Sequence, residues 1–401
     1  MKHVYLIYRE SQSLQYGIGT YIAQLKTLLP SSWTLTLFIL FSDMPDLIIN
    51  WEGTRLRVMK IPAFACREND NLTEDCGRNL AYILLRYVDV SENLVFHFNY
   101  VQDYTLLKYL KFLLPNAVMV LTLHCLSWGI LLRGDWNKLR IMQEQMDTSI
   151  SLDINEFKVC WEQEKVMLNS VDKVICLNRA VLNFVNLEYG VSIDKLVLKP
   201  NVLRDVGTNC LKGMKVDFKF DEAEKIILYV GRIEEYKGID FVIEAFRSVL
   251  QQIENVRLVI VGDGDYHYCL RQCSDICGKV TLTGRIEQEQ LLKLYQIAEF
   301  GLLLSAMEQC SYVCIEMMMH SLPLIVTDVM GLDEMVDENI NGFRIPMTNN
   351  AKGLVPEMDK LKKCMIQLLE NEELRLELSV GSRRLFEKKY NADSVKDWYD
   401  Y

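Results

Sequence analysis

The sequence predicts an α/β protein built from two doubly wound domains, each containing a mainly parallel sheet. Short apolar strands alternate with amphipathic helices along the whole chain of 401 residues, which is typical of parallel sheets covered by helices on both faces. A chain of this length usually forms two domains. Hydrophobic residues make up 50% of the chain, so each domain can bury a large core.

Composition excludes several classes of protein. The net charge is -10 with both signs spread along the chain, so we expect no nucleic-acid partner, which would require a basic face. No apolar run approaches the ~20 residues of a membrane-spanning helix. The first ten residues favour a strand over a signal peptide, and the twelve cysteines form no paired framework. We therefore expect a cytoplasmic protein with reduced, buried cysteines.

The first half of the chain predicts one domain over residues 1–203. A helix is expected from Gly17 to Leu29, another over Asn155–Asn169, and irregular loop and helix over 129–155. A polar stretch without periodicity, residues 204–224, is predicted to be a linker. The candidate strands are His3–Tyr8, Leu35–Phe41, Leu56–Ile61, Leu94–Phe98, Val118–His124, Val174–Leu177 and Leu196–Lys199.

The second half predicts a similar domain over residues 225–389, and residues 390–401 are expected to pack back on the first domain. Two facing domains would leave a ligand cleft between them. The candidate strands are Lys225–Val230, Arg257–Val261, Val280–Thr283, Phe300–Ser305, Leu322–Thr327 and Gly342–Pro346. The candidate helices are Ile239–Ile253, Tyr266–Cys277, Glu287–Ala298, Tyr312–Met319, Leu332–Val336, Pro356–Glu370 and Glu372–Lys389.

Two glutamates mark a candidate binding site between a strand and a helix. Glu308 lies on the loop after the apolar run Phe300–Ser305, and Glu316 lies in the first turns of the next helix. Ligands of open α/β sheets bind at this edge. A helix that begins near Ser311 presents free N–H groups to a phosphate, and the carboxylates can accept hydroxyl hydrogens from a sugar or ribose. Two solvated glutamates are the plainer alternative.

A second loop offers two cations at the same edge. Strand Ile226–Val230 runs into Gly231-Arg232-Ile-Glu-Glu-Tyr-Lys237-Gly238. Arg232 and Lys237 can neutralise a diphosphate there, since arginine can bond two of its oxygens at once. Solvated basic residues in a surface loop are the alternative.

Other patterns carry less information. Asp263 and Asp265 form an Asp-x-Asp pair but are expected to make a tight turn into a helix rather than a metal site. Gly17-Ile-Gly19 lacks the third glycine of a dinucleotide fingerprint. Cys269, Cys273 and Cys277 would share one helix face, where core packing is favoured over metal binding because no histidine cluster accompanies them. We therefore predict no metal.

The second half contains a series of short motifs in a specific order. They are Gly231-Arg232…Lys237-Gly238, Val261-Gly-Asp-Gly264, Leu282-Thr-Gly-Arg285, Leu294-Tyr295, Ser305…Glu308…Glu316, Pro323-Leu-Ile-Val-Thr-Asp328, Gly331-Leu-Asp-Glu334 and Asn341-Gly-Phe343. The first half adds Gly17-Ile-Gly19, His97, Val-Leu-Thr-Leu-His124, Val171-Asp-Lys-Val-Ile and Leu198-Lys-Pro-Asn201. This order resembles the nucleotide-sugar domain of glycosyltransferase family 4, a group of retaining enzymes with the GT-B fold. The match is dense over residues 225–347 and looser in the first half, and it implies two facing Rossmann-like domains with a cleft between them.

The resemblance implies roles for residues at the donor. Arg232 and Lys237 would hold the donor diphosphate, Glu316 the ribose, and Glu308 the donor sugar. The backbone of Ser311, Tyr312 and Val313 would contact phosphate or sugar. Arg285 or Ile286 would lie against the base, and Gly17 and Gly19 near the diphosphate and acceptor. His124 would stand beside the reacting sugar carbon. His97 would also lie on the acceptor side, with a hydrogen-bonded core histidine as the alternative.

The chain also departs from the family pattern. Gln309 and Ser311 replace two usual glycines, which narrows the donor-sugar pocket. Met317-Met-Met-His320 replaces small residues and is interpreted as core. Asp265 stands where proline is common, which favours the turn.

The function implied is metal-independent transfer of a sugar, with retained anomeric configuration, from a nucleoside-diphosphate sugar to a hydroxyl. UDP-sugar is the expected donor, and it is a substrate, so no cofactor is predicted. The acceptor would be a sugar, a lipid-linked sugar or a peptide, because the opening through Gly17-Ile-Gly19 also resembles a bacterial subgroup linked to small-peptide maturation.

Other functions and contacts remain open. One alternative is an inactive GT-B partner that stabilises another glycosyltransferase. Such a partner would have lost the charged residues at the phosphate and glutamate positions, which here are Arg232, Lys237, Glu308 and Glu316. The other alternative is a nucleotide-sugar epimerase. A peripheral contact with the inner membrane face through Lys108-Tyr-Leu-Lys111 is an alternative to an ordinary amphipathic helix.

Overall fold

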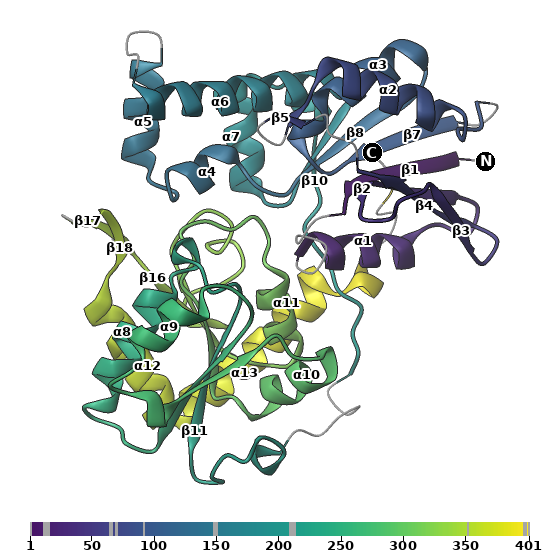
Figure 1. Ribbon diagram of the computed structural model, residues 1–401. Helices are drawn as coiled ribbons and strands as arrows, with labels where there is room; N and C mark the ends of the chain where they lie inside the picture. Colours follow the sequence, from purple (N-terminus) through teal and green to yellow (C-terminus); the bar gives the residue numbers. More distant parts are fainter. Residues whose placement is uncertain are drawn as a thin grey trace. The chain divides into compact units, whose positions relative to one another are not determined.

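The chain folds into two compact units. The computed structural model describes residues 2–10, 17–63, 67–68, 71–90, 93–146, 151–207, 214–350, 353–395 and 399. The first unit contains the residues up to Leu131, Trp136–Pro200 and Tyr399; the second contains Leu132–Asp135 and Asn201–Val395 (Figure 1). Each unit is an α/β domain with a parallel sheet, which confirms the predicted fold class.

The first unit is built on an eight-stranded sheet with the order β10-β9-β8-β7-β1-β2-β4-β3. Neighbouring strands are parallel except β3, which runs antiparallel to β4. The strands are β1 (Lys2–Arg9), β2 (Thr34–Ser42), β3 (Ile48–Glu52), β4 (Leu56–Pro62), β7 (Asn93–Phe98), β8 (Val118–Leu123), β9 (Lys173–Cys176) and β10 (Leu196–Leu198). A separate antiparallel pair joins β5 (Arg67–Glu68) to β6 (Asn71–Leu72). The central strands β1 and β2 are buried on both faces, which explains their continuous apolar sequences.

Helices cover both faces of this sheet. In Figure 1, α1 (Gly17–Leu28) lies on one face, and α2 (Glu74–Leu85) and α3 (Tyr104–Leu113) lie on the other. The face that α1 buries comprises Tyr21, Ile22 and Leu25, at helical spacing. The remaining elements are α4 (Ser127–Leu131), α5 (Trp136–Gln145), α6 (Leu152–Ser170), α7 (Arg179–Tyr189) and the 3-10 turns η2 (Val101–Asp103) and η3 (Ile193–Lys195).

The second unit has a six-stranded sheet, all parallel, with the order β13-β12-β11-β14-β15-β16. The strands are β11 (Lys225–Val230), β12 (Val256–Val261), β13 (Val280–Gly284), β14 (Phe300–Leu303), β15 (Leu324–Thr327) and β16 (Gly342–Ile345). A hairpin of β17 (Met347–Asn350) and β18 (Gly353–Pro356) follows. The chain moves outward from β11 to β13, then returns to the other side of β11 with β14.

Helices again cover both faces of the sheet. In Figure 1, α8 (Ile239–Leu250), α9 (Tyr266–Gln272) and α12 (Met358–Glu370) lie on one side, with α10 (Gln288–Ile297) and α11 (Tyr312–Met319) on the other. A buried core joins β11, β12 and β14 to α8 and α12. The other elements are α13 (Glu372–Leu385), the π-helical turn η7 (Phe386–Tyr390) and the 3-10 turns η4 (Lys215–Phe218), η5 (Glu235–Lys237), η6 (Cys277–Lys279) and η8 (Ala392–Ser394).

Three helix predictions in this unit were wrong in extent or type. The predicted helix Leu332–Val336 is a series of turns, in which the N–H groups of Met335 and Val336 both donate to the Leu332 carbonyl, so the hydrogen bonds do not advance one residue at a time as in a helix. The helix predicted to reach Cys277 ends at Gln272, whose carbonyl accepts a hydrogen bond from the Arg247 guanidinium at 2.7 Å. The predicted helix Glu372–Lys389 stops at Leu385 and continues as a π-helical turn.

The predicted linker, residues 204–224, and the last residues of the chain both pack against structured parts of the protein. Within the predicted linker, Asp205 forms an ion pair with Arg383, and the Phe220 ring lies 5.6 Å from the Arg257 guanidinium. Near the end of the chain, Ala392 N–H donates to the Leu203 carbonyl at 2.9 Å in the second unit. Tyr399 belongs to the first unit, where its hydroxyl donates to a carbonyl of α1 at 2.8 Å.

Candidate donor site at the sheet edge of the second unit

The strand order places the candidate residues of the second unit at one edge of its sheet. All six strands are parallel, so their carboxyl ends meet at the same edge. The loops that follow β11 and β14 are neighbours there, because the order of the strands reverses between these two. Such a reversal is where open α/β sheets bind ligands.

A close backbone approach joins these two loops. After β11 the chain makes the turn η5 and enters α8 through Gly238, whose φ of +71° is in the left-handed region. A Cβ at Gly238 would lie 2.1 Å from the Leu304 carbonyl oxygen, at the end of β14. Only glycine fits this contact without a shift of the backbone, so it brings the Lys237 loop directly against the Glu308 loop.

Lys237 and Glu308 form an ion pair at the reversal point. The Lys237 Nζ donates to Glu308 Oε1 at 2.5 Å, and the Ser305 hydroxyl donates to the same oxygen at 2.9 Å. The two charged side chains are 20% and 16% exposed, so they are largely enclosed yet still reachable from solvent. The sequence had placed both residues at this edge, and the structure brings them into contact across 71 residues.

Arg232 lies in the same loop but in a more exposed position. Its Nη1 donates to Glu234 Oε1 at 3.0 Å. The ring of Tyr236 lies 5.1 Å from the Arg232 guanidinium and 5.1 Å from the Lys237 ammonium. Both distances are within the range of cation–π attraction, so this aromatic ring holds the two cations near each other.

Helix α11 begins as predicted, with Ser311 as its N-cap. The Ser311 hydroxyl accepts a hydrogen bond from Cys314 N–H at 3.4 Å. The N–H groups of Tyr312 and Val313 fall in the first turn, where a helix provides no backbone partner. The side chain of Tyr312 is buried and that of Val313 is half-buried. Any contact of Tyr312 with a ligand would therefore use its backbone.

Glu316 lies one turn further along α11 and is held by a tyrosine. The hydroxyl of Tyr295, on α10, donates to Glu316 Oε2 at 2.7 Å. Burial raises the pKa of the Glu316 carboxyl to about 7, although the hydrogen bond from Tyr295 acts in the opposite direction. In the sequence Tyr295 is visible only as part of the Leu294-Tyr295 motif, and no local pattern indicates its contact with Glu316.

Arg285 and Ile286 follow β13, two strands away from β11 at the same edge. Neighbouring strands are ~4.8 Å apart, so this loop is ~10 Å from the end of β11. Arg285 is exposed and Ile286 is half-buried. A base held here and a diphosphate held at Lys237 would span the breadth of three strands.

The Asp-x-Asp pair makes a turn, as expected. Asp265 caps α9 by accepting from Tyr268 N–H at 2.8 Å, and Asp263 accepts from the Tyr266 hydroxyl at 2.6 Å. Cys269 and Cys273 are buried, but Cys277 lies on η6 and is exposed, so the three cysteines do not share one helix face. Among the described residues, no group of three or more His, Cys, Asp or Glu side chains could hold a metal ion.

The histidines and glycines of the first unit form a second cluster at the carboxyl edge of its own sheet. Gly17 and Gly19 open α1, and the half-buried His124 follows β8. His124 Nε2 lies 2.9 Å from Asn99 Oδ1, and the Tyr21 ring packs edge-on against His124 at 4.7 Å. Burial lowers the pKa of His124 to about 3, so the ring is neutral at neutral pH.

His97 differs from His124 because it has no exposed surface. Its Nε2 lies 2.7 Å from the Thr122 hydroxyl, which also bonds to the hydroxyl of Tyr21. Burial also lowers the pKa of His97 to about 3. In this arrangement His97 lies within the core, whereas His124 is half-buried.

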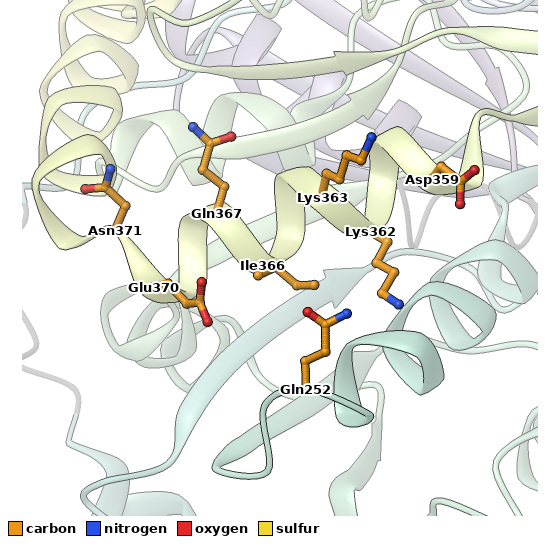
Figure 2. A pocket seen from close by; sticks show the side chains of 8 residues that line it. All are labelled: Gln252, Asp359, Lys362, Lys363, Ile366, Gln367, Glu370 and Asn371. Atoms are coloured by element: carbon orange, nitrogen blue, oxygen red, sulfur yellow. The ribbon is translucent and has the colours of Figure 1, made fainter.

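A groove of about 540 Å³ lies elsewhere in the second unit. Figure 2 shows that the side chains along α12 form one side of it and that Gln252, just after α8, forms the other. It shares no residue with the candidate donor site. Its lining mixes Lys362 and Lys363 with Asp359 and Glu370, so it shows no preference for a ligand of either charge.

Part of the second unit is similar to a known protein family. Residues 214–384 match the family described as Glycosyl transferases group 1. This match agrees with the resemblance that the motif order indicates. The loops after β11 and β14 and the whole of α11 lie inside the match.

A curated glycosyltransferase is similar to part of this chain. Over 175 residues the chain is 29% identical to alpha-D-kanosaminyltransferase of Streptomyces kanamyceticus, covering 43% of each protein. The chain spans about half or less of the length of the first curated relatives that it matches.

Solved structures confirm the GT-B fold. Sucrose-phosphate synthase from Thermosynechococcus elongatus superposes with a TM-score of 0.75 at 20% identity, over 98% of this chain and 96% of that one. Anabaena Alr3699/HepE in complex with UDP superposes with a TM-score of 0.69 at 13% identity, with the same coverage. Within the described part of the chain, no helix has both the length and the apolar character needed to cross a bilayer.

Proposed function

We propose that this protein transfers a sugar from a nucleoside-diphosphate sugar to a hydroxyl acceptor, with retained anomeric configuration and without a metal ion. The observation that carries the proposal is the Lys237–Glu308 pair, placed at the strand-order reversal beside the capped start of α11. This arrangement combines a cation, a carboxylate and helix N–H groups within one loop pair of a glycosyltransferase domain.

In this proposal the donor diphosphate lies between Lys237, Arg232 and the first N–H groups of α11. The phosphate would compete with Glu308 for the Lys237 ammonium and with Glu234 for the Arg232 guanidinium. Glu308, released in part from Lys237, could then accept hydroxyl hydrogens from the donor sugar. Glu316 would accept those of the ribose.

The chemical step uses charge stabilisation by the protein. The acceptor hydroxyl attacks the anomeric carbon on the face from which the phosphate leaves, and its proton passes to a departing phosphate oxygen. Negative charge grows on the diphosphate through an oxocarbenium-like state, and preorganised cations and N–H groups stabilise that charge. His124 would contribute a hydrogen bond rather than a proton, because its pKa of about 3 keeps it neutral.

The partners follow from the same proposal. The nucleotide sugar is a substrate, so no cofactor is required, and protein cations take the place of a metal. UDP-sugars come first for testing, since a structural neighbour was solved in complex with UDP. We propose a sugar, a lipid-linked sugar or a peptide as acceptor, and a cytoplasmic location that includes the inner membrane face.

The test is thermal unfolding of the wild type with UDP-, GDP-, ADP- and TDP-sugars in the presence of a chelator. A donor at ~100 times its Kd stabilises the folded state by ~2.7 kcal/mol, which raises the Tm by roughly 5–10 °C for a domain of this size. Glu316→Ala should abolish the shift, whereas Glu289→Ala should retain it, because Glu289 is an exposed residue of α10 paired with Lys293. Absence of a shift with every donor would favour an inactive partner subunit.

A further inference from the structure

We propose that Tyr295 is a positioning residue for the donor nucleotide, because its hydroxyl fixes one carboxylate oxygen of Glu316 and leaves the other to receive the ribose hydroxyls. This inference rests on the proposed function, in which Glu316 binds the ribose. It adds a specific task for a residue that lies behind the site and has no contact with the ligand in this proposal.

Two contacts with one helix hold Tyr295 in place. Its hydroxyl donates to Glu316 Oε2 at 2.7 Å, and its ring stacks on His320 with the ring centres 5.6 Å apart and the planes at 22°. Glu316 and His320 are four residues apart on α11 and its C-cap, so they lie on the same helix face. The phenol therefore bridges α10 to this face, and its hydroxyl has a defined position.

Tyr295 and Glu316 differ in how far solvent can reach them. Tyr295 is 1% exposed, whereas Glu316 retains part of its surface. Among the residues that the structure describes, only Tyr295 donates a hydrogen bond to the Glu316 side chain. Glu316 is thus the more accessible of the two residues, and the proposal assigns its second oxygen, Oε1, to the ribose.

The electrostatics support a role in keeping Glu316 ionised. A carboxylate only accepts hydrogen bonds and can accept from two ribose hydroxyls, whereas protonation turns one of its oxygens into a donor and leaves fewer acceptor positions. Burial raises the pKa of Glu316 to about 7, and the Tyr295 hydrogen bond opposes this rise. The titratable neighbours on α11 and at its C-cap are neutral near pH 7. Burial raises the pKa values of Tyr312 and Cys314 and lowers that of His320.

The test is calorimetric titration of UDP, or of whichever of GDP, ADP and TDP the donor panel selects, between about pH 6 and about pH 9. Wild-type affinity should increase with pH through a midpoint near the Glu316 pKa of about 7. In Tyr295→Phe the midpoint should move up by ~1 unit or more, with a ~10-fold loss of affinity at neutral pH that shrinks towards pH 9. The ring and its stacking on His320 are retained in this variant.

Two control variants make the result specific. Glu316→Gln removes the titrating group, so its curve reports only the ionisation of the nucleotide phosphate, with a pKa of about 6. The double variant Tyr295→Phe/Glu316→Gln should bind as Glu316→Gln alone does. Tyr390→Phe removes a hydroxyl from another buried tyrosine of the same unit and should follow the wild-type curve.

Three outcomes would overturn an argument, each in a distinct way. Coincident curves for Tyr295→Phe and wild type would mean that the hydroxyl does not position Glu316. A loss of affinity that is equal at every pH would indicate a packing defect and would also overturn the inference. A wild type that binds none of the four nucleotides would refute the proposed function itself, before Tyr295 is considered.

Discussion

Lys237→Ala is the substitution that examines the candidate site most directly. Among the residues that the structure describes, the lysine is the group that pairs with Glu308 through charge, and the Ser305 hydroxyl donates a second hydrogen bond to the same oxygen. Removing the ammonium therefore has two separable effects. It takes a cation from the proposed diphosphate site, and it leaves a carboxylate that is only 16% exposed with a hydroxyl as its remaining donor.

The expected magnitudes follow from this geometry. Loss of one preorganised charge contact to the leaving group typically lowers turnover by ~100-fold or more, equivalent to ~2.7 kcal/mol. A buried acceptor deprived of its charged partner costs about 1–3 kcal/mol in stability, and the low end applies because Ser305 remains and the pair is partly exposed. Glu308→Ala in the same chain should recover most of this stability, so the two substitutions should be non-additive by ~1 kcal/mol.

The assay is the initial rate of sugar transfer or donor hydrolysis at saturating donor, together with urea denaturation of each variant. Lys279→Ala is the matched control, because Lys279 is a partly exposed lysine of the same unit, 3.9 Å from Glu224 before the start of β13. It lies at the opposite edge of the sheet and should leave turnover unchanged. A folded Lys237→Ala protein that loses less than ~3-fold in turnover would contradict the diphosphate role, since a single oxyanion contact is normally worth far more.

Two further substitutions, one in each unit, test the stability of the folded protein. Glu164 is buried in the first unit, and burial raises its carboxyl pKa from 4.5 to about 7. Stability tied to its neutral form is fully present below the usual pKa of 4.5 and is lost as the pH rises from there to about 7. Glu164→Gln should therefore be more stable than wild type by up to about 3 kcal/mol at about pH 8 and equal to it near pH 4, by urea denaturation; an equal difference at both pH values would contradict this. Gly238→Ala should destabilise the second unit by more than ~2 kcal/mol and abolish the donor-dependent Tm shift, because its Cβ would meet Leu304 oxygen at 2.1 Å. Gly190→Ala has a similar φ of +67° with nothing within 4 Å, and should cost only ~1 kcal/mol; equal losses at both glycines would refute the argument from close approach.

The strand–loop–helix order was readable from the sequence because it depends on local patterns. The apolar run Phe300–Ser305 followed by a serine cap predicted β14 and the start of α11 to within two residues. The position of Lys237 after another apolar strand placed it at the same kind of sheet edge. Each of these inferences needs only periodicity, capping chemistry and the parallel direction of the strands.

Elements stabilised by distant partners were harder to predict. The end of α9 depends on Arg247, whose guanidinium donates a hydrogen bond to the Gln272 carbonyl. In a longer helix this carbonyl would accept from a backbone N–H instead. The edge strand β3 and the strand β17 are short, mostly exposed and paired with one neighbour each, so their sequences lack the apolar alternation of a buried strand.

Hydrophobic periodicity and the order of motifs were enough to predict two α/β domains and a second half that resembles a glycosyltransferase domain. The folded structure was needed to show that Lys237 bonds to Glu308, that Tyr295 donates to Glu316, and that His97 is buried while His124 is half-buried. Those facts depend on which strands are neighbours and on how helices pack across the sheet, and residues far apart in sequence carry no local signal of either.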